Sequence, residues 1–301
     1  MRRCSFTSSC LSVVFDMLLA ITYLLPGEVG TITSTSPGFL NGIWWSYDPI
    51  VIDFHSEQYT AHQCPSDSVE VSGDMLDDGG SPGWKPISVE YLQKTTCTSW
   101  IEKNFPERCA SFDKEAWLQL STTFPRKNMS FCMDRYEWPN VKGTTPWVMV
   151  TYPEAQGLCE SVGKRLCTED EWTFACEGEE GLPYPWGYER RSEECGTDKR
   201  WKKYSSSALA DRGSQKCSKE LERLWQGDPS GSRPTCASPF GVEDMSGNVD
   251  EWASRTRQGK YVSILKGGYW GPVRTRCRPS TRNHGPGHTF YQQGFRCCSD
   301  L

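Results

Sequence analysis

The sequence predicts a loop-rich domain in which long ordered loops connect short helices and short strands. The 301 residues include 27 glycines, 19 prolines and 13 tryptophans, and only 37% are hydrophobic. That mixture suits a fold with aromatic anchors rather than a helical bundle. The best helix signals lie together between residues 151 and 178, whereas the C-terminal part shows no helical periodicity and predicts short strands and loops.

Two consecutive helices are predicted in that central stretch. The first begins at Thr151 with a proline near its N-terminus, and Gly163 suits the position just beyond its end. The second begins at Thr168, which forms a capping box with Glu171, and ends at Gly178. Their predicted buried residues are Ala155, Leu158, Cys159 and Val162 in the first helix and Trp172, Ala175 and Cys176 in the second.

The upstream half predicts strands and an insert. Residues 131–138 alternate between apolar and polar, as a half-buried strand does. Val69 and Val71 mark a shorter strand-like stretch, which a loop over residues 73–86 interrupts. Residues 87–127 predict a helical insert, and residues 221–225 predict one short helix. The buried candidates in the insert are Trp100, Ile101, Phe105, Trp117 and Leu118.

The 15 cysteines predict disulfides in an oxidising compartment rather than zinc sites. No C-x2-C pair occurs and the chain has only four histidines. Cys97 and Cys109 flank the first part of the insert and are placed to staple it. If Cys4 and Cys10 leave with a signal peptide, 13 cysteines remain, so at least one is expected to be free or to pair between chains.

The N-terminus predicts a signal peptide. Arg2 and Arg3 precede an apolar run of 15 residues, 11–25, which Asp16 interrupts. A membrane span needs about 20 apolar residues, whereas a signal-peptide core needs roughly 7–15. We therefore expect a signal peptide over residues 1–27, with a signal anchor or a misassigned start codon as alternatives, and a linker over residues 28–63.

Composition and motifs exclude several function classes. The net charge is −5 and no run of basic residues suggests a nucleic-acid surface. The sequence contains no P-loop, G-x-G-x-x-G, H-E-x-x-H or nucleophile elbow. No stable membrane span is expected in the mature chain.

Several segments, in this order and spacing, resemble the formylglycine-generating enzyme or sulfatase-modifying factor superfamily, of which the chain looks like a divergent member. The match covers residues 64–300, with inserts at about 74–127 and 190–232. The resemblance implies an irregular α+β domain, loop-rich and related to the C-type lectin fold. The segments that carry it are Asp134-Arg135-Tyr136-Glu137, Gly163-Lys164-Arg165-Leu166, Thr168-Glu169-Asp170-Glu171-Trp172, Tyr184-Pro185-Trp186-Gly187, Phe240-Gly241-Val242-Glu243-Asp244-Met245-Ser246-Gly247-Asn248-Val249-Asp250-Glu251-Trp252, Leu265-Lys266-Gly267-Gly268-Tyr269-Trp270 and Gly294-Phe295-Arg296-Cys297-Cys298.

The resemblance also implies two disulfides and a calcium site. The implied disulfides are Cys159–Cys297 and Cys176–Cys277, with free core thiols as the alternative. The implied structural calcium ligands are the side chains of Asp244 and Glu251 and the backbone carbonyls of Gly247 and Val249. The alternative is an ordinary turn, since Asp, Ser, Gly and Asn are common turn residues.

The chemistry that the resemblance implies is the copper-dependent oxidation of a substrate cysteine to formylglycine. Two thiolates hold the copper in the family, between the Lys-Gly-Gly segment and the cysteine that Cys277 matches. Residues 269–276 occupy that interval here and contain no cysteine, and Asp250 stands where the family commonly has tryptophan. Cys298 is the one plausible loose thiol, and a single thiolate is a poor copper site, so copper is not expected.

A different pocket is predicted near the same interval. Four arginines beside an aromatic residue suit an acidic or sulfated ligand, and the alternative is that several of them are structural. The two histidines form either a metal pair or, more simply, an exposed loop pair. The pocket candidates are Asp250, Trp270, Arg274, Arg276, Arg278, Arg282, His284 and His288.

Three functional hypotheses follow. The first is a possible pseudoenzyme, secreted or located in the periplasm or the secretory-pathway lumen, that binds a ligand or a polypeptide. The second is an enzyme of the same fold with altered, metal-dependent oxidative chemistry. The third is an oxidoreductase of the formylglycine-generating type, which acts on a sulfatase cysteine.

Overall fold

A computed structural model describes residues 30–32, 38–40, 43–45, 52–54, 63–81 and 83–301. The predicted signal segment lies outside the described residues. Within the predicted linker, the described parts form two short antiparallel ladders, β1 with β4 and β2 with β3. Their strands are β1 (Gly30–Ile32), β2 (Gly38–Leu40), β3 (Ile43–Trp45) and β4 (Ile52–Phe54).

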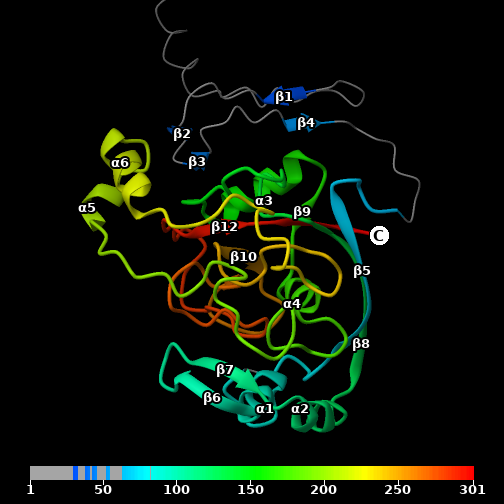
Figure 1. Cartoon of the computed structure of the whole chain (residues 1–301). Coiled ribbons are helices and arrows are strands. Elements are labelled where there is room, and N and C mark those ends of the chain that lie inside the picture. Colours follow the sequence, from blue (N-terminus) through cyan, green and yellow to red (C-terminus); the bar gives the residue numbers. More distant parts are fainter. Residues whose placement is uncertain (1–29, 33–37, 41–42, 46–51, 55–62, 82) are drawn as a thin grey trace, which may run out of the picture.

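A four-stranded antiparallel sheet lines one side of the domain, in the order β5-β8-β13-β9 (Figure 1). Strand β8, which pairs with both β5 and β13, confirms the strand predicted over residues 131–138, but it begins and ends a few residues earlier. Strand β5 runs through Gly73 up to Leu76, so the predicted loop starts later than expected. A side chain at Gly73 would lie 2.7 Å from Glu179 Oε1, so glycine lets the strand pass this carboxylate. The strands are β5 (Ser68–Leu76), β8 (Arg126–Asp134), β9 (Arg165–Leu166) and β13 (Cys297–Asp300).

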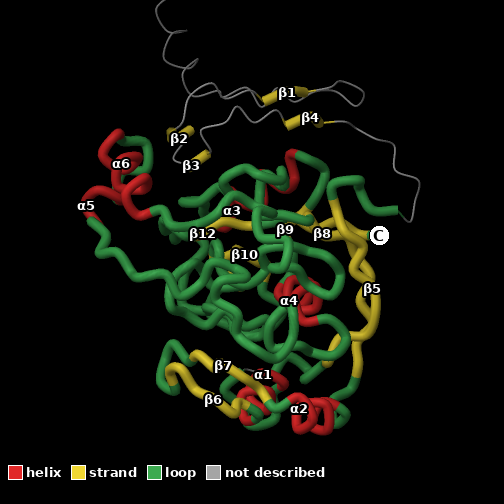
Figure 2. The backbone as a smooth tube through the Cα atoms, viewed as in Figure 1, coloured by secondary structure: helices red, strands yellow, loops and turns green. Residues whose placement is uncertain are grey.

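A second, three-stranded sheet lies inside the loops of the C-terminal part, as the lack of helical periodicity predicted (Figure 2). Its middle strand β10 pairs parallel with β12 and antiparallel with β11. This register places Glu251 opposite both Gly294 and Lys266. The strands are β10 (Asp250–Ser254), β11 (Ser263–Lys266) and β12 (Gln293–Phe295).

The two predicted helices are confirmed as α3 (Tyr152–Ser161) and α4 (Glu169–Glu177). Each begins with a complete capping box, in which the threonine and the glutamate three residues later satisfy each other's backbone N–H groups. Nearly all of α4 is buried, so this helix forms part of the core. Gly163 and Gly178 follow the helices with positive φ, where glycine avoids a steric penalty.

The first insert contains a hairpin as well as helices, and lies at the lower edge in Figure 1. Of its predicted core residues, Trp117 is fully buried and donates from Nε1 to the Glu180 carbonyl. Ile101, Phe105 and Leu118 are 48%, 78% and 37% exposed, so predicting them as buried was wrong. Two lie in the β6–β7 hairpin, which has too few neighbours to cover both of its faces. The elements are α1 (Val89–Thr95), β6 (Cys97–Glu102), β7 (Arg108–Phe112) and α2 (Lys114–Ser121).

The second insert contains two short helices, α5 (Ser206–Leu209) and α6 (Gln215–Leu224). The helix predicted over residues 221–225 therefore begins earlier. Ser214 caps it by accepting a hydrogen bond from the Cys217 N–H, and its buried residues Cys217, Leu221 and Leu224 form one face.

Six disulfides cross-link the described residues, and both bonds that the resemblance implied are among them. Cys298, predicted to be loose, is bonded to Cys167, and Cys217 is the free and buried thiol of the described part. The bonds are Cys64–Cys132, Cys97–Cys109, Cys159–Cys297, Cys167–Cys298, Cys176–Cys277 and Cys195–Cys236. Such a disulfide density fits an extracellular or lumenal protein.

A glycine substitution tests how tightly the first insert is packed on the domain. Gly181 has φ +68°, and a Cβ there would lie 2.5 Å from Leu76 Cδ1 and 3.2 Å from Trp117 Cζ2. We expect Gly181→Ala to lower the free energy of unfolding by about 3 kcal/mol, from backbone strain plus overpacking. The matched control is Gly143→Ala, with φ +83° and nothing within 4 Å, which should cost only about 1–2 kcal/mol. Equal losses in denaturant unfolding would contradict this packing.

Candidate functional site

The segment of residues 269–276 is held in place by side chains from the first insert. The Arg274 guanidinium lies 4.9 Å above the Phe105 ring, and its Nη1 is 3.9 Å from Glu107 Oε2. Two residues later, Arg276 is buried, donates from Nη1 to Gln93 Oε1 over 3.0 Å and lies 5.6 Å from the Phe112 ring. The hairpin and α1 therefore contact the first and the last residue of the stretch 274–276.

The residue between them is fixed by a buried arginine. Arg190 donates from Nη1 to Thr275 Oγ1 over 2.9 Å and forms a two-pronged ion pair with Asp198, at 2.8 Å on each side. Asp198 also accepts from Arg108 Nη1 of the hairpin over 3.0 Å. The ion pair with Asp198 raises the pKa of Arg190 despite its burial. Each of the three residues 274–276 therefore contacts a side chain from outside the segment.

Asp250 lies at the start of β10, next to this segment. Burial raises the pKa of its carboxyl to about 7, while the Gly268 N–H and the Arg274 guanidinium act in the opposite direction. Trp270 is 1% exposed and packs edge-on against Trp225, with ring centroids 4.8 Å apart. The structure therefore brings Asp250 and Arg274 near each other but turns Trp270 into the core.

The other two arginines form ion pairs elsewhere in the domain. Arg278 is buried in an ion pair with Glu177, and Arg282 Nη2 lies 3.0 Å from Glu169 Oε1. Both carboxylates belong to α4. The four arginines therefore do not converge on one pocket, and the buried, bonded Arg276 and Arg278 match the alternative in which several arginines are structural.

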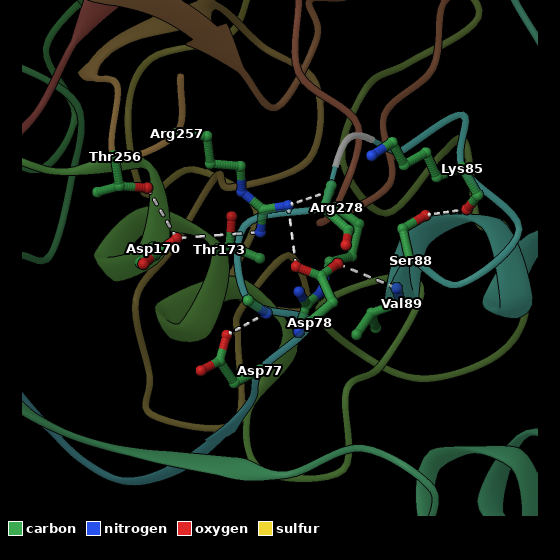
Figure 3. Close-up of polar contacts among 12 residues, drawn as sticks. Asp77, Asp78, Lys85, Ser88, Val89, Asp170, Thr173, Thr256, Arg257 and Arg278 are labelled. Atoms are coloured by element: carbon green, nitrogen blue, oxygen red, sulfur yellow. Dashed lines mark hydrogen bonds and ion pairs between the residues drawn. The ribbon is translucent and has the colours of Figure 1, made fainter. Parts of the chain in front are cut away.

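A network beside Arg278 fastens the insert to the domain (Figure 3). Arg257 Nη1 lies 3.1 Å from Asp78 Oδ1 and also donates to the Ser81 carbonyl. The second oxygen of Asp78 accepts the Val89 N–H at the start of α1 over 3.0 Å. Asp170 of α4 accepts from Thr256 and lies 4.0 Å from Arg257. These charges hold the loop before α1 against α4.

The two histidines of the predicted pocket stack on each other, with ring centroids 4.0 Å apart. His288 Nδ1 is 3.0 Å from Gln293 Oε1, and both burial and His288 lower the pKa of His284. Within residues 63–81 and 83–301, no three His, Cys, Asp or Glu side chains are grouped closely enough to hold a metal ion. The histidine pair therefore has no third ligand of these types there.

The loop predicted to bind calcium contains a buried ion pair. Glu251 accepts from Arg296 Nε and Nη2 over 2.7 and 2.8 Å, and from Trp172 Nε1 over 2.7 Å. Asp244 Oδ2 accepts the Gly231 N–H over 2.6 Å, and burial raises the pKa of Asp244 to about 6. Both oxygens of Glu251 are therefore occupied in this conformation.

Glu137 is a third buried carboxylate at this loop, and the sequence-based prediction missed it. It accepts from Ser230 and Asn248, and burial together with Asp244 raises its pKa. With Asp244 and Glu251, three buried carboxylates surround the single guanidinium of Arg296. Glu137 and Arg296 belong to motifs that carry the family resemblance, and this was the only signal in the sequence that could have revealed them.

Lys266 of the Lys-Gly-Gly segment is buried in β11. Its Nζ donates to the carbonyls of Cys277 and Arg278 over 2.8 and 2.9 Å. Burial lowers the pKa of Lys266 from 10.5 to about 7, although Glu169 acts in the opposite direction. The lysine thus joins β11 to the loop at residues 277–278 through backbone carbonyls.

We expect the free energy of unfolding to rise from pH 7 to pH 9 because of Lys266. Between its folded and unfolded pKa values, the unfolded chain binds more protons than the folded one. The stabilisation is complete above the unfolded pKa and is lost as the pH falls toward 7, and over this range it amounts to about 2 kcal/mol. Denaturant unfolding of Lys266→Met should lack this rise, and an equal rise in both proteins would contradict the assignment.

Comparisons with known proteins agree with these motifs. Residues 95–301 match the model of the sulfatase-modifying factor enzyme 1-like domain. The chain is 32% identical over 167 residues to the inactive C-alpha-formylglycine-generating enzyme 2 of Mus musculus, covering 51% of this chain and 49% of that protein. It is also 32% identical over 110 residues to the formylglycine-generating enzyme of Mycobacterium tuberculosis, covering 36% and 33%. The chain thus spans half or less of the length of these two relatives.

A solved structure, that of CarF, covers 79% of this chain and 99% of its own, with 14% identity and a TM-score of 0.46.

Proposed function

Because the chain belongs to the sulfatase-modifying factor enzyme 1-like family, we propose that it is a member that binds polypeptides and does not generate formylglycine. The observation that carries the proposal is the segment 269–276. It contains no cysteine, and each of its residues 274–276 is bonded to a partner from elsewhere in the chain. The interval that holds the two thiolates in the family has no cysteine here, and its Arg274 and Arg276 contact the first insert instead.

The remaining cysteines supply no replacement site. Twelve of the described cysteines are in disulfides, and Cys217 lies in α6, buried among apolar residues. Burial raises the pKa of the Cys217 thiol to about 11, so it is protonated at neutral pH. A soft metal such as Cu(I) binds thiolates, not thiols. The residues described therefore do not fit a copper cofactor.

A Cu(I) titration tests this part of the proposal. Oxidised protein is mixed with one equivalent of Cu(I) in the presence of a chromogenic Cu(I) chelator, beside an active formylglycine-generating enzyme. The chelator should keep the copper in the presence of this protein and lose it to the active enzyme. Retention of one copper, with an ultraviolet band from thiolate bonding, would show that a copper site has been rebuilt.

The compartment is part of the proposal. The described residues contain no helix that is long and apolar enough to cross a membrane. Six disulfides in the same residues suit an oxidising environment. We propose that the protein enters the secretory pathway through the segment of residues 1–27 and works in the lumen or outside the cell.

Calcium is proposed as a structural ion of the loop from Asp244 to Glu251. Glu137, Asp244 and Glu251 are buried around the single guanidinium of Arg296, and a divalent cation beside them would favour their ionised forms. Glu251 would share its carboxylate between the ion and Arg296, and the carbonyls of Gly247 and Val249 would complete the ligands.

A melting experiment tests this ion. Calcium should raise the unfolding temperature relative to EDTA, whereas magnesium should not, because the larger ion suits a loop of several oxygens. Asp244→Asn should abolish the difference between calcium and EDTA. Identical melting curves for the wild-type protein in calcium and EDTA would show that calcium is not a structural ion of this loop.

A further inference from the structure

The first insert and the segment after α4 line an open cleft of about 780 Å³. This volume lies within the range of known ligand sites. One wall comes from the end of β7 and the start of α2, and the other from residues 180–191. None of the residues 269–276 lines the cleft, so it is separate from the family's catalytic position.

The cleft has an ordered aromatic wall. Trp186 stacks on Tyr184 with ring centroids 5.7 Å apart and nearly parallel planes, and Phe112 packs edge-on against the same tyrosine. Trp186 Nε1 donates to the Glu189 carbonyl over 2.7 Å, which fixes the indole. Tyr188 stands beside it and donates from its hydroxyl to Glu180 Oε1 over 2.7 Å. Trp186 and Tyr188 remain partly exposed, so ring surface is available to a bound side chain.

Carboxylates dominate the charges of the cleft. Four acidic residues line it against two basic ones, Lys114 and Arg191. All six are exposed, and the carboxylate of Glu180 is held in place by Tyr188. Aromatic faces beside carboxylates attract ammonium and guanidinium groups through cation–π and ionic contacts together. The acidic residues are Asp113, Glu115, Glu180 and Glu189.

A lysine of the chain itself already makes this kind of contact. Lys114 Nζ lies 5.6 Å from the centre of the Tyr188 ring and 3.9 Å from Glu180 Oε1. Its side chain is 52% exposed, so the contact is weak and easily exchanged. The cleft therefore holds an ammonium between a ring and a carboxylate, and an incoming lysine or arginine can replace it.

We propose that this cleft binds a lysine- or arginine-rich segment of a partner polypeptide, which displaces Lys114 from Tyr188 and Glu180. Acidic residues on both walls provide for more than one basic side chain, which favours an extended segment over a single amine. The proposal deepens the binding role proposed above and rests on it. Its failure would leave the absence of formylglycine formation untouched, because none of the residues 269–276 lines the cleft.

The test is fluorescence anisotropy with the full-length protein and three labelled peptides, which are repeats of Arg-Gly, Ser-Gly and Glu-Gly of equal length. The Arg-Gly peptide should bind at least tenfold more tightly than the Ser-Gly peptide, and the Glu-Gly peptide should not bind. The triple variant Glu115→Gln, Glu180→Gln, Glu189→Gln should weaken Arg-Gly binding at least tenfold.

A matched control separates the cleft from general charge attraction. Glu70→Gln, Glu160→Gln, Glu193→Gln removes the same three charges from exposed positions outside the cleft and should weaken binding less than threefold. Equal weakening by both triple variants, or no preference for the Arg-Gly peptide, would overturn the proposal. Melting curves of both variants should match that of the wild-type protein.

Removing Lys114 provides a second test, in which binding should become tighter rather than weaker. Lys114→Ala should tighten Arg-Gly binding several-fold, because the peptide no longer competes with a resident ammonium. Lys103→Ala removes an exposed charge from the hairpin, outside the cleft, and should change binding less than twofold. If both lysine variants change binding equally, Lys114 does not occupy the peptide's position.

Discussion

Removing both disulfides that end at Cys297 and Cys298 should cost about 1 kcal/mol more than the two separate losses added together. The bonds Cys159–Cys297 and Cys167–Cys298 close loops of 138 and 131 residues and join the same two parts of the chain. With one bond intact, the other closes a further loop of only about ten residues, worth about 3 kcal/mol in the chain-entropy model. With both removed, Cys176–Cys277 still joins the same two parts of the chain, so the loop that opens has only about 30 residues and the combined cost is about 6–7 kcal/mol.

A double-mutant cycle measures this redundancy. Each bond is replaced by a pair of alanines, and the free energy of unfolding is measured by denaturant for each protein and for the combination. We expect a coupling of about 1 kcal/mol between the bonds, because Cys176–Cys277 still restrains the unfolded chain. Simple additivity would mean that the two bonds restrain the unfolded chain independently, contrary to their neighbouring positions in the fold.

Arg296→Leu should destabilise the protein by about 3–5 kcal/mol, because it leaves a buried carboxylate without its partner. Arg296 is fully buried and bonds both oxygens of Glu251, and its Nη2 also donates to the Glu243 carbonyl. Glu137 and Asp244 lose the same compensating charge. Denaturant unfolding at neutral pH measures the loss.

An exposed ion pair provides the control for Arg296. Arg165 pairs with Glu171 and Asp300, but its side chain is 37% exposed, so Arg165→Leu should cost at most about 1 kcal/mol. Glu251→Gln combined with Arg296→Leu should recover part of the loss, since no buried charge is then left at this pair. A cost below about 1.5 kcal/mol for Arg296→Leu alone would contradict the assigned role of the guanidinium.

The helices were predictable because their signals are local. Thr151 and Thr168 mark helix starts through side chains that bond within three residues, and Gly163 and Gly178 mark the ends. The disulfides Cys159–Cys297 and Cys176–Cys277 were accessible only through the resemblance, since cysteine spacing alone does not fix connectivity.

The site was harder to predict because its contacts are distant in sequence. Arg274, Arg276 and Arg278 alternate along the chain and look like one cluster, but the first two bond the insert and the third bonds α4. Gln93 lies 183 residues before Arg276, and no local pattern links them. Exposed Phe105 was likewise unpredictable, because its ring covers Arg274 rather than entering a core.

The most direct test of the central claim is a mass-spectrometric assay of peptide oxidation. Purified oxidised protein, supplied with copper and calcium, is incubated with a peptide that carries a sulfatase-type Cys-x-Pro-x-Arg site, beside an active formylglycine-generating enzyme. The account predicts an unchanged cysteine with this protein and an aldehyde with the control enzyme. Conversion of the cysteine to the aldehyde by this protein would contradict the account and mean that residues other than 269–276 hold a working copper site.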